Sequence, residues 1–316
     1  MSIGDDFLSF IIALEEFACG SAALALSISV TEAVNHLLYR YGSRDQHKYI
    51  EALRKGEVFG AVALDVSGFD TNASCQVRNA SGNSETILNA VYPFVPNAPL
   101  ADMVVIFAKT DAGSDCSFIL DRHTAGITVA ESAPLMGLQS LAGGRLELKD
   151  VRIRVDNRLG GENQGEAVFE GLEMRTQIAI GAIAVGISQL ALEEAVTHAK
   201  NRIQFGKPLA RMEATRNKIA NMASGIEAAR LLVYRAAALI DQGKHSAYSA
   251  AMAKMIASDL AVEVCKEAVQ IHGGYGYVKD YPVERLYRDA LFTQIYNTTN
   301  ATQRFRIAEQ VYRKIK

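Results

Sequence analysis

The sequence predicts an α+β protein of three consecutive parts, because the spacing of its apolar residues changes twice along the chain. Apolar residues recur every three or four positions up to about Lys55, at a period near two from Val58, and at helical spacing again in the second half. We therefore expect a helical amino-terminal domain over residues 1–57, an antiparallel β domain over 58–155 and a helical bundle over 156–316.

The amino-terminal part is predicted to be helical from its apolar periodicity. Phe10, Ile11 and Leu14 begin a row of apolar residues at helical spacing, and the row continues to Leu53. We expect this helical segment to end near Gly56.

The middle part is predicted to be a β domain of about a hundred residues, an ordinary size for a domain. Short apolar or alternating runs occupy residues 58–59, 103–108, 127–130 and 146–155. Clusters of Gly, Asn, Asp, Ser and Pro separate these runs, which is the pattern of strands joined by turns.

The last part begins after a turn-rich hinge at residues 156–165. We expect two long helices, separated by the helix-stopping Gly206-Lys207-Pro208, and three further helices. The expected bounds are 168–204, 211–241, 246–272, 281–296 and from about 300 to the end. Antiparallel helices of this length joined by short loops favour a helical bundle.

Small residues form a row on the first long helix of this bundle. The row consists of Ala179, Gly181, Ala182, Ala184 and Gly186. Small side chains let a neighbouring helix approach closely, so tight helix packing is the preferred interpretation, and close approach of a flat ligand is the alternative.

Composition excludes several classes of function. Lys and Arg total 33 and Asp and Glu total 35, so the net charge of −2 provides no positive field for nucleic acid. The four cysteines form no CxxC pair and the six histidines have no metal-ligand spacing, so neither a metal site nor a disulfide framework is expected. The sequence shows no signal-peptide pattern, and residues 178–187 are too few to span a bilayer, so we expect a cytoplasmic protein.

Four motifs follow one another in the second half of the chain. They are RIQFGKPL at 202–209, QIHGGYGY at 270–277, YPVERLYRDA at 281–290 and IYNTTN at 295–300. Together they resemble the carboxyl-terminal domain of the acyl-CoA dehydrogenase family. The resemblance covers nearly the whole chain, although the family's first amino-terminal helices are not found. It implies a truncated helical domain, a β domain and a four-helix bundle, with FAD held between two subunits.

The chemistry of two motifs suits a phosphate ligand. The guanidinium of Arg202 can pair bidentately with a phosphate, and Gly273 and Gly274 allow backbone N–H groups to approach one. The alternatives are a surface ion pair for Arg202 and an ordinary turn after a helix for the glycines. His272, beside them, is interpreted as a helix-end residue rather than an acid or base.

The resemblance assigns cofactor contacts residue by residue. It implies that Arg202 and Phe205 contact the FAD of a neighbouring subunit and that Thr299 meets the pyrophosphate from the other side. It also implies that the adenosine-pyrophosphate half of FAD is held by Gln270, Gly273 and Gly274.

The catalytic base of the family is missing from its usual places. The family removes an α proton from an acyl-CoA with a carboxylate while hydride leaves to the flavin, and only a group basic at neutral pH can take that proton. The resemblance places Asn297 at the common glutamate position and Thr176 at the alternative one, and neither side chain is a base. Glu173, one turn before Thr176, is a substitute candidate, although a solvated first-turn glutamate is the ordinary interpretation.

The segments that would face the flavin ring also depart from the family pattern. The matching places are residues 63–68 (ALDVSG) and 94–97 (FVPN). The second segment lacks the family's threonine hydroxyl, and Pro96 also lacks an N–H. The flavin half-site of this subunit is thus damaged, whereas the half-site offered to a neighbour is intact.

Three hypotheses follow for the function. The first is a base-deficient subunit of a heteromeric acyl-CoA dehydrogenase, an oxidoreductase acting on CH–CH groups, that completes the FAD site of a partner subunit. The second is a self-sufficient flavoenzyme using a displaced base such as Glu173, and the third is a flavin-free scaffold. The expected partners are an acyl-CoA or other acyl thioester, a second copy or another acyl-CoA dehydrogenase subunit, and electron-transfer flavoprotein.

Overall fold

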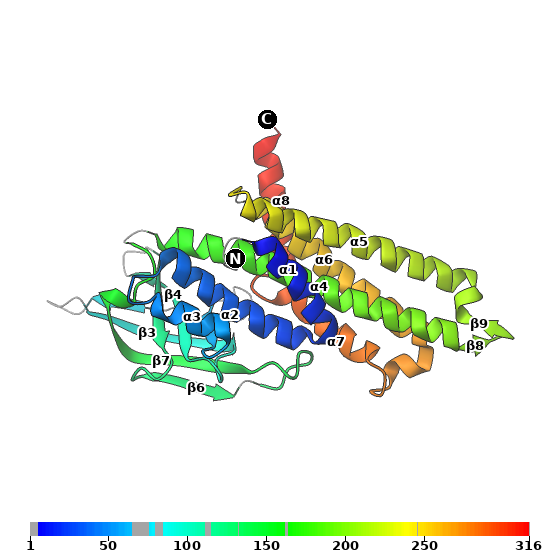
Figure 1. Ribbon diagram of the computed structural model, residues 1–316, viewed down its shortest axis with the longest axis horizontal. Coiled ribbons are helices and arrows are strands. Elements are labelled where there is room, and N and C mark those ends of the chain that lie inside the picture. The colour runs from blue at the N-terminus through cyan, green and yellow to red at the C-terminus, as the bar shows by residue number, and fades with distance from the viewer. Residues whose placement is uncertain are drawn as a thin grey trace. The chain divides into compact units, whose positions relative to one another are not determined.

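The computed structural model describes residues 6–64, 76–79, 85–110, 115–131, 133–161, 164–244 and 246–315 (Figure 1). The chain forms two compact units. The helical unit comprises Met1–Ala25, Leu135–Gln139 and Gln177–Lys316, and the β unit comprises Leu26–Pro134 and Ser140–Thr176. The predicted changes from helix to strand and back are confirmed in order. The division into three domains at residues 57 and 155 stays a prediction.

The β unit contains most of α2 (Ala22–Tyr41), α3 (Lys48–Lys55) and one mixed sheet. Gly56 ends α3 in the left-handed conformation, with φ 71° and its N–H bonded to Ala52 and Leu53, as expected from its position in the sequence. The strands among the described residues are β1 (Gly60–Ala63), β2 (Gln76–Asn79), β3 (Glu85–Pro96), β4 (Met103–Thr110), β5 (Asp115–Asp121), β6 (Ile127–Glu131) and β7 (Gly143–Arg154).

The prediction of a purely antiparallel sheet is wrong. The strand order is β1-β4-β2-β3-β7-β6, with β5 paired to β4, and both β1 and β2 run parallel to β4. A two-residue period tells only which side chains share a face of a strand, and it carries no information about pairing direction. The first strand also begins at Gly60 rather than at Val58.

The sheet buries one apolar face in its core. Leu88 and Tyr92 of β3, Val104 and Ile106 of β4 and Leu146 of β7 all belong to this buried cluster. Alternation along β7 breaks at Asp150, which has a positive φ of 49°, and the β3–β7 register shifts at this level. An irregularity of this kind is a β-bulge, which keeps the apolar residues on both sides of it facing the core.

The helical unit contains α1 and five later helices. Their bounds are α1 (Phe7–Gly20), α4 (Gly165–Asn201, in this unit from Gln177), α5 (Glu213–Asp241), α6 (Ala247–His272), α7 (Val283–Ile295) and α8 (Asn300–Lys314). The predicted stop after α4 is a short hairpin of β8 (Ile203–Gln204) and β9 (Lys207–Pro208). Phe205 and Gly206 at the tip of this hairpin both have positive φ values. Helix α4 ends at Asn201, three residues earlier than the expected Gln204.

Helix α4 is packed closely by its neighbours where its residues are small. A Cβ built on Gly186 would lie 2.4 Å from the backbone oxygen of Glu15 in α1, and one on Gly181 would lie 2.9 Å from Val233 in α5. The prediction of tight helix packing is therefore confirmed. The helix is long and apolar enough to cross a membrane by composition, but 72% of its apolar window is buried by protein, as in a core helix.

We predict that Gly186→Ala destabilises the protein. Replacing a helical glycine by alanine ordinarily stabilises a helix by about 0.5–1 kcal/mol. At Gly186 the added methyl group meets backbone and forces α1 away from α4, at a cost of about 1–3 kcal/mol, so the net effect is a loss. Urea unfolding of both proteins measures it.

The control is Gly171→Ala on the same helix. Its added Cβ would lie 3.6 Å from the Tyr41 hydroxyl, an ordinary contact, so its stability should equal or exceed that of the wild type. A Gly186→Ala protein as stable as the Gly171→Ala protein would contradict the packing argument.

Candidate functional site

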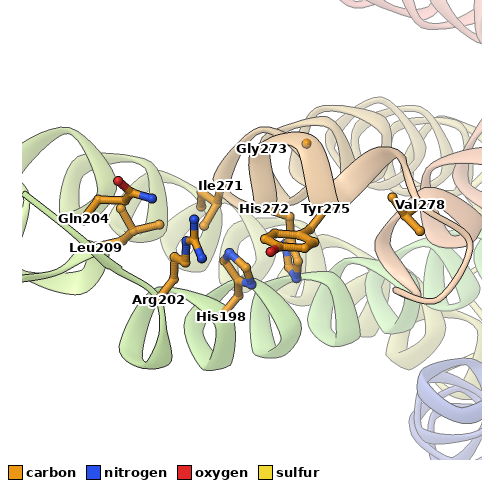
Figure 2. Close-up of a pocket in the computed structure, with 10 residues that line it drawn as sticks. His198, Arg202, Gln204, Leu209, Ile271, His272, Gly273, Tyr275 and Val278 are labelled. Carbon is orange, nitrogen blue, oxygen red and sulfur yellow. The ribbon is translucent and has the colours of Figure 1, made fainter.

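A pocket of about 510 Å³ lies in the helical unit where the end of α4 meets the end of α6 (Figure 2). Its side chains come from the last turn of α4, the β8–β9 hairpin and the 3₁₀ turn η4 (Gly273–Tyr277) that follows α6. The lining residues are His198, Arg202, Gln204, Leu209, Ile271, His272, Gly273, Gly274, Tyr275 and Val278.

The glycines after α6 leave an open face of backbone on the pocket. Gly273 ends the helix with a φ of 61°, a conformation that favours glycine. A Cβ at Gly273 or Gly274 would meet no atom within 4 Å, so packing inside the chain does not explain why these positions lack side chains. Gly276 differs, because a Cβ at this position would lie 2.5 Å from the Val269 oxygen. A glycine is needed here for the turn to pack against α6.

Arg202 brings a cation to this face. Its guanidinium carbon lies 5.5 Å from the centre of the Tyr275 ring, within cation–π range. In the described part of the chain no carboxylate forms an ion pair with Arg202, so the surface ion pair considered above is not found. A half-buried guanidinium with free N–H groups beside open backbone suits a phosphate ligand.

Two histidines stack next to Arg202. The rings of His198 on α4 and His272 on α6 are 4.2 Å apart, and Nδ1 of His272 lies 2.8 Å from the Ala268 carbonyl oxygen. His272 is the last residue of α6, as predicted. Burial, followed by the proximity of His272 and Arg202, lowers the pKa of His198 below its ordinary 6.5. The sequence reasoning missed His198, and the signal available for it was its spacing of four residues before Arg202.

The structure brings together some of the predicted cofactor residues and leaves others outside the pocket. Arg202, Gly273 and Gly274 all line it. Phe205 is 92% exposed at the hairpin tip, and Gln270 is exposed on α6. Thr299 caps α8, where its hydroxyl accepts from the Thr302 N–H at 3.3 Å. The cofactor roles of all six residues stay predictions.

The turn between α7 and α8 carries Asn297, the residue at the expected base position. Asn297 is 4% exposed and has a positive φ of 66°. Its Nδ2 group is buried and has no acceptor among the residues that the structure describes. An unsatisfied buried donor costs about 1–3 kcal/mol, and such groups in native structures call for an explanation such as a ligand acceptor.

A fully buried lysine holds this turn in place. Nζ of Lys254 on α6 donates to the Gln294 oxygen at 2.9 Å, to the Thr298 oxygen at 2.6 Å and to Oδ1 of Asn300 at 2.7 Å. Burial lowers the pKa of Lys254 to about 7, while the charge of Asp259 opposes this shift. The three acceptors also favour the ammonium, because it has three N–H groups to donate.

The remaining candidates lie in the β unit. The Thr176 hydroxyl donates to the Leu172 oxygen of its own helix at 2.9 Å, and Glu173 is half-buried on the same helix. Pro96 ends β3, and the amide of Asn97 bonds to Ser27 and Gly60, which is a structural role. Positions 65–68 of the other expected flavin segment lie outside the described residues.

The pocket fits the pyrophosphate of FAD on its own chemistry. It offers an arginine without a carboxylate partner and an open glycine turn, and none of the side chains lining it is acidic. Clusters of His, Cys, Asp and Glu able to hold a metal were not found within the described ranges.

Comparisons with known proteins show the family to which the chain belongs. The model of the "Acyl-CoA dehydrogenase, C-terminal domain" family matches residues 163–312. An acyl-CoA dehydrogenase of Bacillus subtilis is 40% identical over 314 residues, which cover 97% of this chain and 83% of that protein. The chain therefore belongs to the acyl-CoA dehydrogenase family.

Two further proteins are similar to this chain, one by sequence and one by structure. Subunit CarC of the caffeyl-CoA reductase–Etf complex of Acetobacterium woodii is 37% identical over 319 residues, covering 98% of this chain and 84% of CarC. The FAD complex of PigA matches with a TM-score of 0.89 and 29% identity, over 97% of this chain and 82% of PigA.

We predict that Lys254→Met lowers the free energy of unfolding by about 2–4 kcal/mol. The substitution removes the lysine donor from the Gln294 and Thr298 oxygens and leaves Oδ1 of Asn300 with only the Ser258 hydroxyl at 3.2 Å, and each unsatisfied group costs about 1–3 kcal/mol before relaxation. Urea denaturation measures the change.

Lys266→Met on the same helix is the matched control. Lys266 is exposed and pairs with Glu263 at 3.2 Å, and such surface pairs contribute about 0–1 kcal/mol. If the two variants lost equal stability, the anchoring role of Lys254 would be rejected.

Proposed function

We propose that this protein is the base-deficient subunit of a heteromeric, FAD-dependent acyl-CoA dehydrogenase and that it completes the FAD site of a catalytic partner subunit. The observation that carries the proposal is a contrast within the chain. The pocket around Arg202 combines this arginine with Gly273 and Gly274, which suit a phosphate, whereas Asn297 and Thr176 stand where the resemblance expects a carboxylate.

In this proposal the residues of the pocket bind and orient the cofactor. Arg202 pairs with the pyrophosphate, and the backbone of Gly273 and Gly274 lies against it. Thr299 meets the pyrophosphate from the other side. When bound, FAD supplies an acceptor for the hydride that leaves the β carbon of the acyl thioester. The FAD complex of PigA supports this choice of cofactor.

The absence of a base argues against independent catalysis. An amide and a hydroxyl cannot take an α proton at neutral pH, and the Thr176 hydroxyl already donates to the Leu172 oxygen. The buried Nδ2 group of Asn297 can only donate a hydrogen bond. It suits contact with an acceptor oxygen, such as a thioester carbonyl, and not proton abstraction.

The partners follow from the same proposal. The membership of CarC in a reductase–Etf complex supports a hetero-oligomer and electron transfer to or from electron-transfer flavoprotein. An acyl-CoA is the substrate class in keeping with the family, and we place the protein in the cytoplasm.

A self-sufficient enzyme is the second candidate. Glu173 is a half-buried carboxylate on the same helix as Thr176, one turn earlier, and is the acid best placed in sequence to replace the missing base. The flavin-free scaffold ranks last, because it gives no reason for an arginine without an acidic partner beside two glycines with open space.

We predict that the isolated protein desaturates acyl-CoA far more slowly than an ordinary dehydrogenase, by about a hundredfold to ten-thousandfold. Loss of general-base catalysis typically has this effect. The measurement is the bleaching of bound flavin by a saturated acyl-CoA in a stopped-flow instrument. Rapid bleaching that Glu173→Gln abolishes would support the self-sufficient enzyme instead.

We predict that Arg202→Ala weakens FAD retention by at least about tenfold and leaves the fold intact. A charge-assisted contact to phosphate contributes about 1.5–3 kcal/mol. The measurement is the flavin-to-protein ratio after gel filtration, alone and with an acyl-CoA dehydrogenase encoded next to the protein.

The control is Arg211→Ala, which removes an exposed charge just beyond the pocket. Loss of FAD only from the complex supports the heteromeric subunit, and loss from the protein alone supports the self-sufficient enzyme. An unchanged ratio in both states would eliminate both flavin-binding functions.

A further inference from the structure

We propose that His198 is a phosphate-recognition residue of the pocket and that it takes up a proton when a pyrophosphate diester binds there. This inference rests on the proposed function, because FAD is such a diester. It goes further by assigning a residue that neither the motifs nor the resemblance selected, and by coupling cofactor affinity to pH.

The geometry places His198 among the groups that would meet the ligand. His198 lies on α4 four residues before Arg202, which follows the last residue of the helix and still donates its N–H to the His198 oxygen at 2.9 Å. Both side chains therefore project from the same side into the pocket (Figure 2). Its ring stacks on His272 at 4.2 Å with an interplanar angle of 27°, and the glycine turn begins at the next residue, Gly273.

The other groups that face His198 come from three further segments. They are His272 on α6, Tyr275 on η4, whose ring centre is 6.3 Å away, and Tyr281 before α7, at 6.4 Å, in addition to Arg202 on its own helix. None of these side chains is a carboxylate that could stabilise an imidazolium ring. Burial and the neighbouring His272 and Arg202 therefore favour the neutral form of His198.

A bound pyrophosphate diester favours the protonated form of His198 instead. Each of its two phosphates carries a negative charge throughout the physiological pH range, and an anion close to an imidazole favours the protonated form. His272 is 4% exposed and its ring is fixed by the contact of Nδ1 with the Ala268 carbonyl oxygen at 2.8 Å. His198 is half-buried on the wall of the pocket and is therefore the histidine more open to a ligand beside Arg202.

The direction of the pH effect follows from linkage. The pKa of His198 is lowered in the free pocket, and the diester raises it. Between these two values binding takes up one proton, so affinity rises as the pH falls, by up to about tenfold per pH unit. Below the lower value and above the higher one, affinity is independent of pH.

The test measures binding of FAD and of ADP-ribose between pH 5.5 and 8. ADP-ribose has the same diester without a flavin ring, so it tests this half-site alone. Wild type is compared with His198→Phe, which keeps a stacking ring but cannot be protonated. His123→Phe is the matched control, because His123 is exposed and lies in the β unit.

We expect wild type and His123→Phe to bind both ligands more tightly as the pH falls, and His198→Phe to bind with constant affinity. The same slope in His198→Phe as in wild type, or a slope that disappears only in His272→Phe, would overturn the assignment. Imidazole NMR of wild type gives a second readout, in which ADP-ribose should raise the pKa of His198. No shift would also overturn it.

The outcomes separate this inference from the function on which it rests. If wild type, alone and with its partner subunit, binds neither ligand at any pH, the proposed function fails and this inference fails with it. If FAD binds with an affinity that does not vary with pH, the proposed function stands and the role of His198 is rejected.

Discussion

The close approach of helix backbones along α4 is the constraint on which the helical unit depends. Gly186 lets the backbone of α1 approach α4 more closely than a side chain would allow, and Gly181 makes room for the Val233 side chain of α5. These contacts fix the packing of α4 against α1 and α5. His198 in the last turn of α4 and Arg202 just after it face the glycine turn at the end of α6.

The buried polar groups around the α7–α8 turn include some with several partners and one donor without an acceptor. Lys254 satisfies three oxygens around the α7–α8 turn, and Asn300, one of its partners, donates in turn to Ser258 at 2.8 Å and Asp259 at 2.7 Å. The turn is therefore held firmly. Asn297 in the same turn keeps a buried donor without an acceptor. A rigid turn with an unsatisfied donor is suited to a ligand, because the protein cannot relax to satisfy the group itself.

The proposed contrast between a phosphate-binding pocket and an absent base has a simple physical meaning. Binding a diester needs a cation and room for a phosphate to approach the backbone, and Arg202 with the turn at Gly273 and Gly274 offers both. Abstracting a proton needs a side chain whose conjugate acid titrates near neutral pH, and Asn297 and Thr176 have none. The two tasks are chemically independent, so a chain can retain the first without the second when another subunit provides the chemistry.

The sequence by itself determined the succession of elements, because helical and strand periods are local properties. It also predicted Arg202, Gly273 and Gly274 as phosphate-binding residues from their chemistry, and an asparagine at position 297 cannot act as a base. The tertiary structure decided which distant residues meet. The parallel pairing of β1 with β4, the burial of Lys254 beneath the α7–α8 turn, and the stacking of His198 on His272 all join segments at least 40 residues apart. The spacing of apolar residues along the sequence does not predict such contacts, because they form only when the whole chain packs.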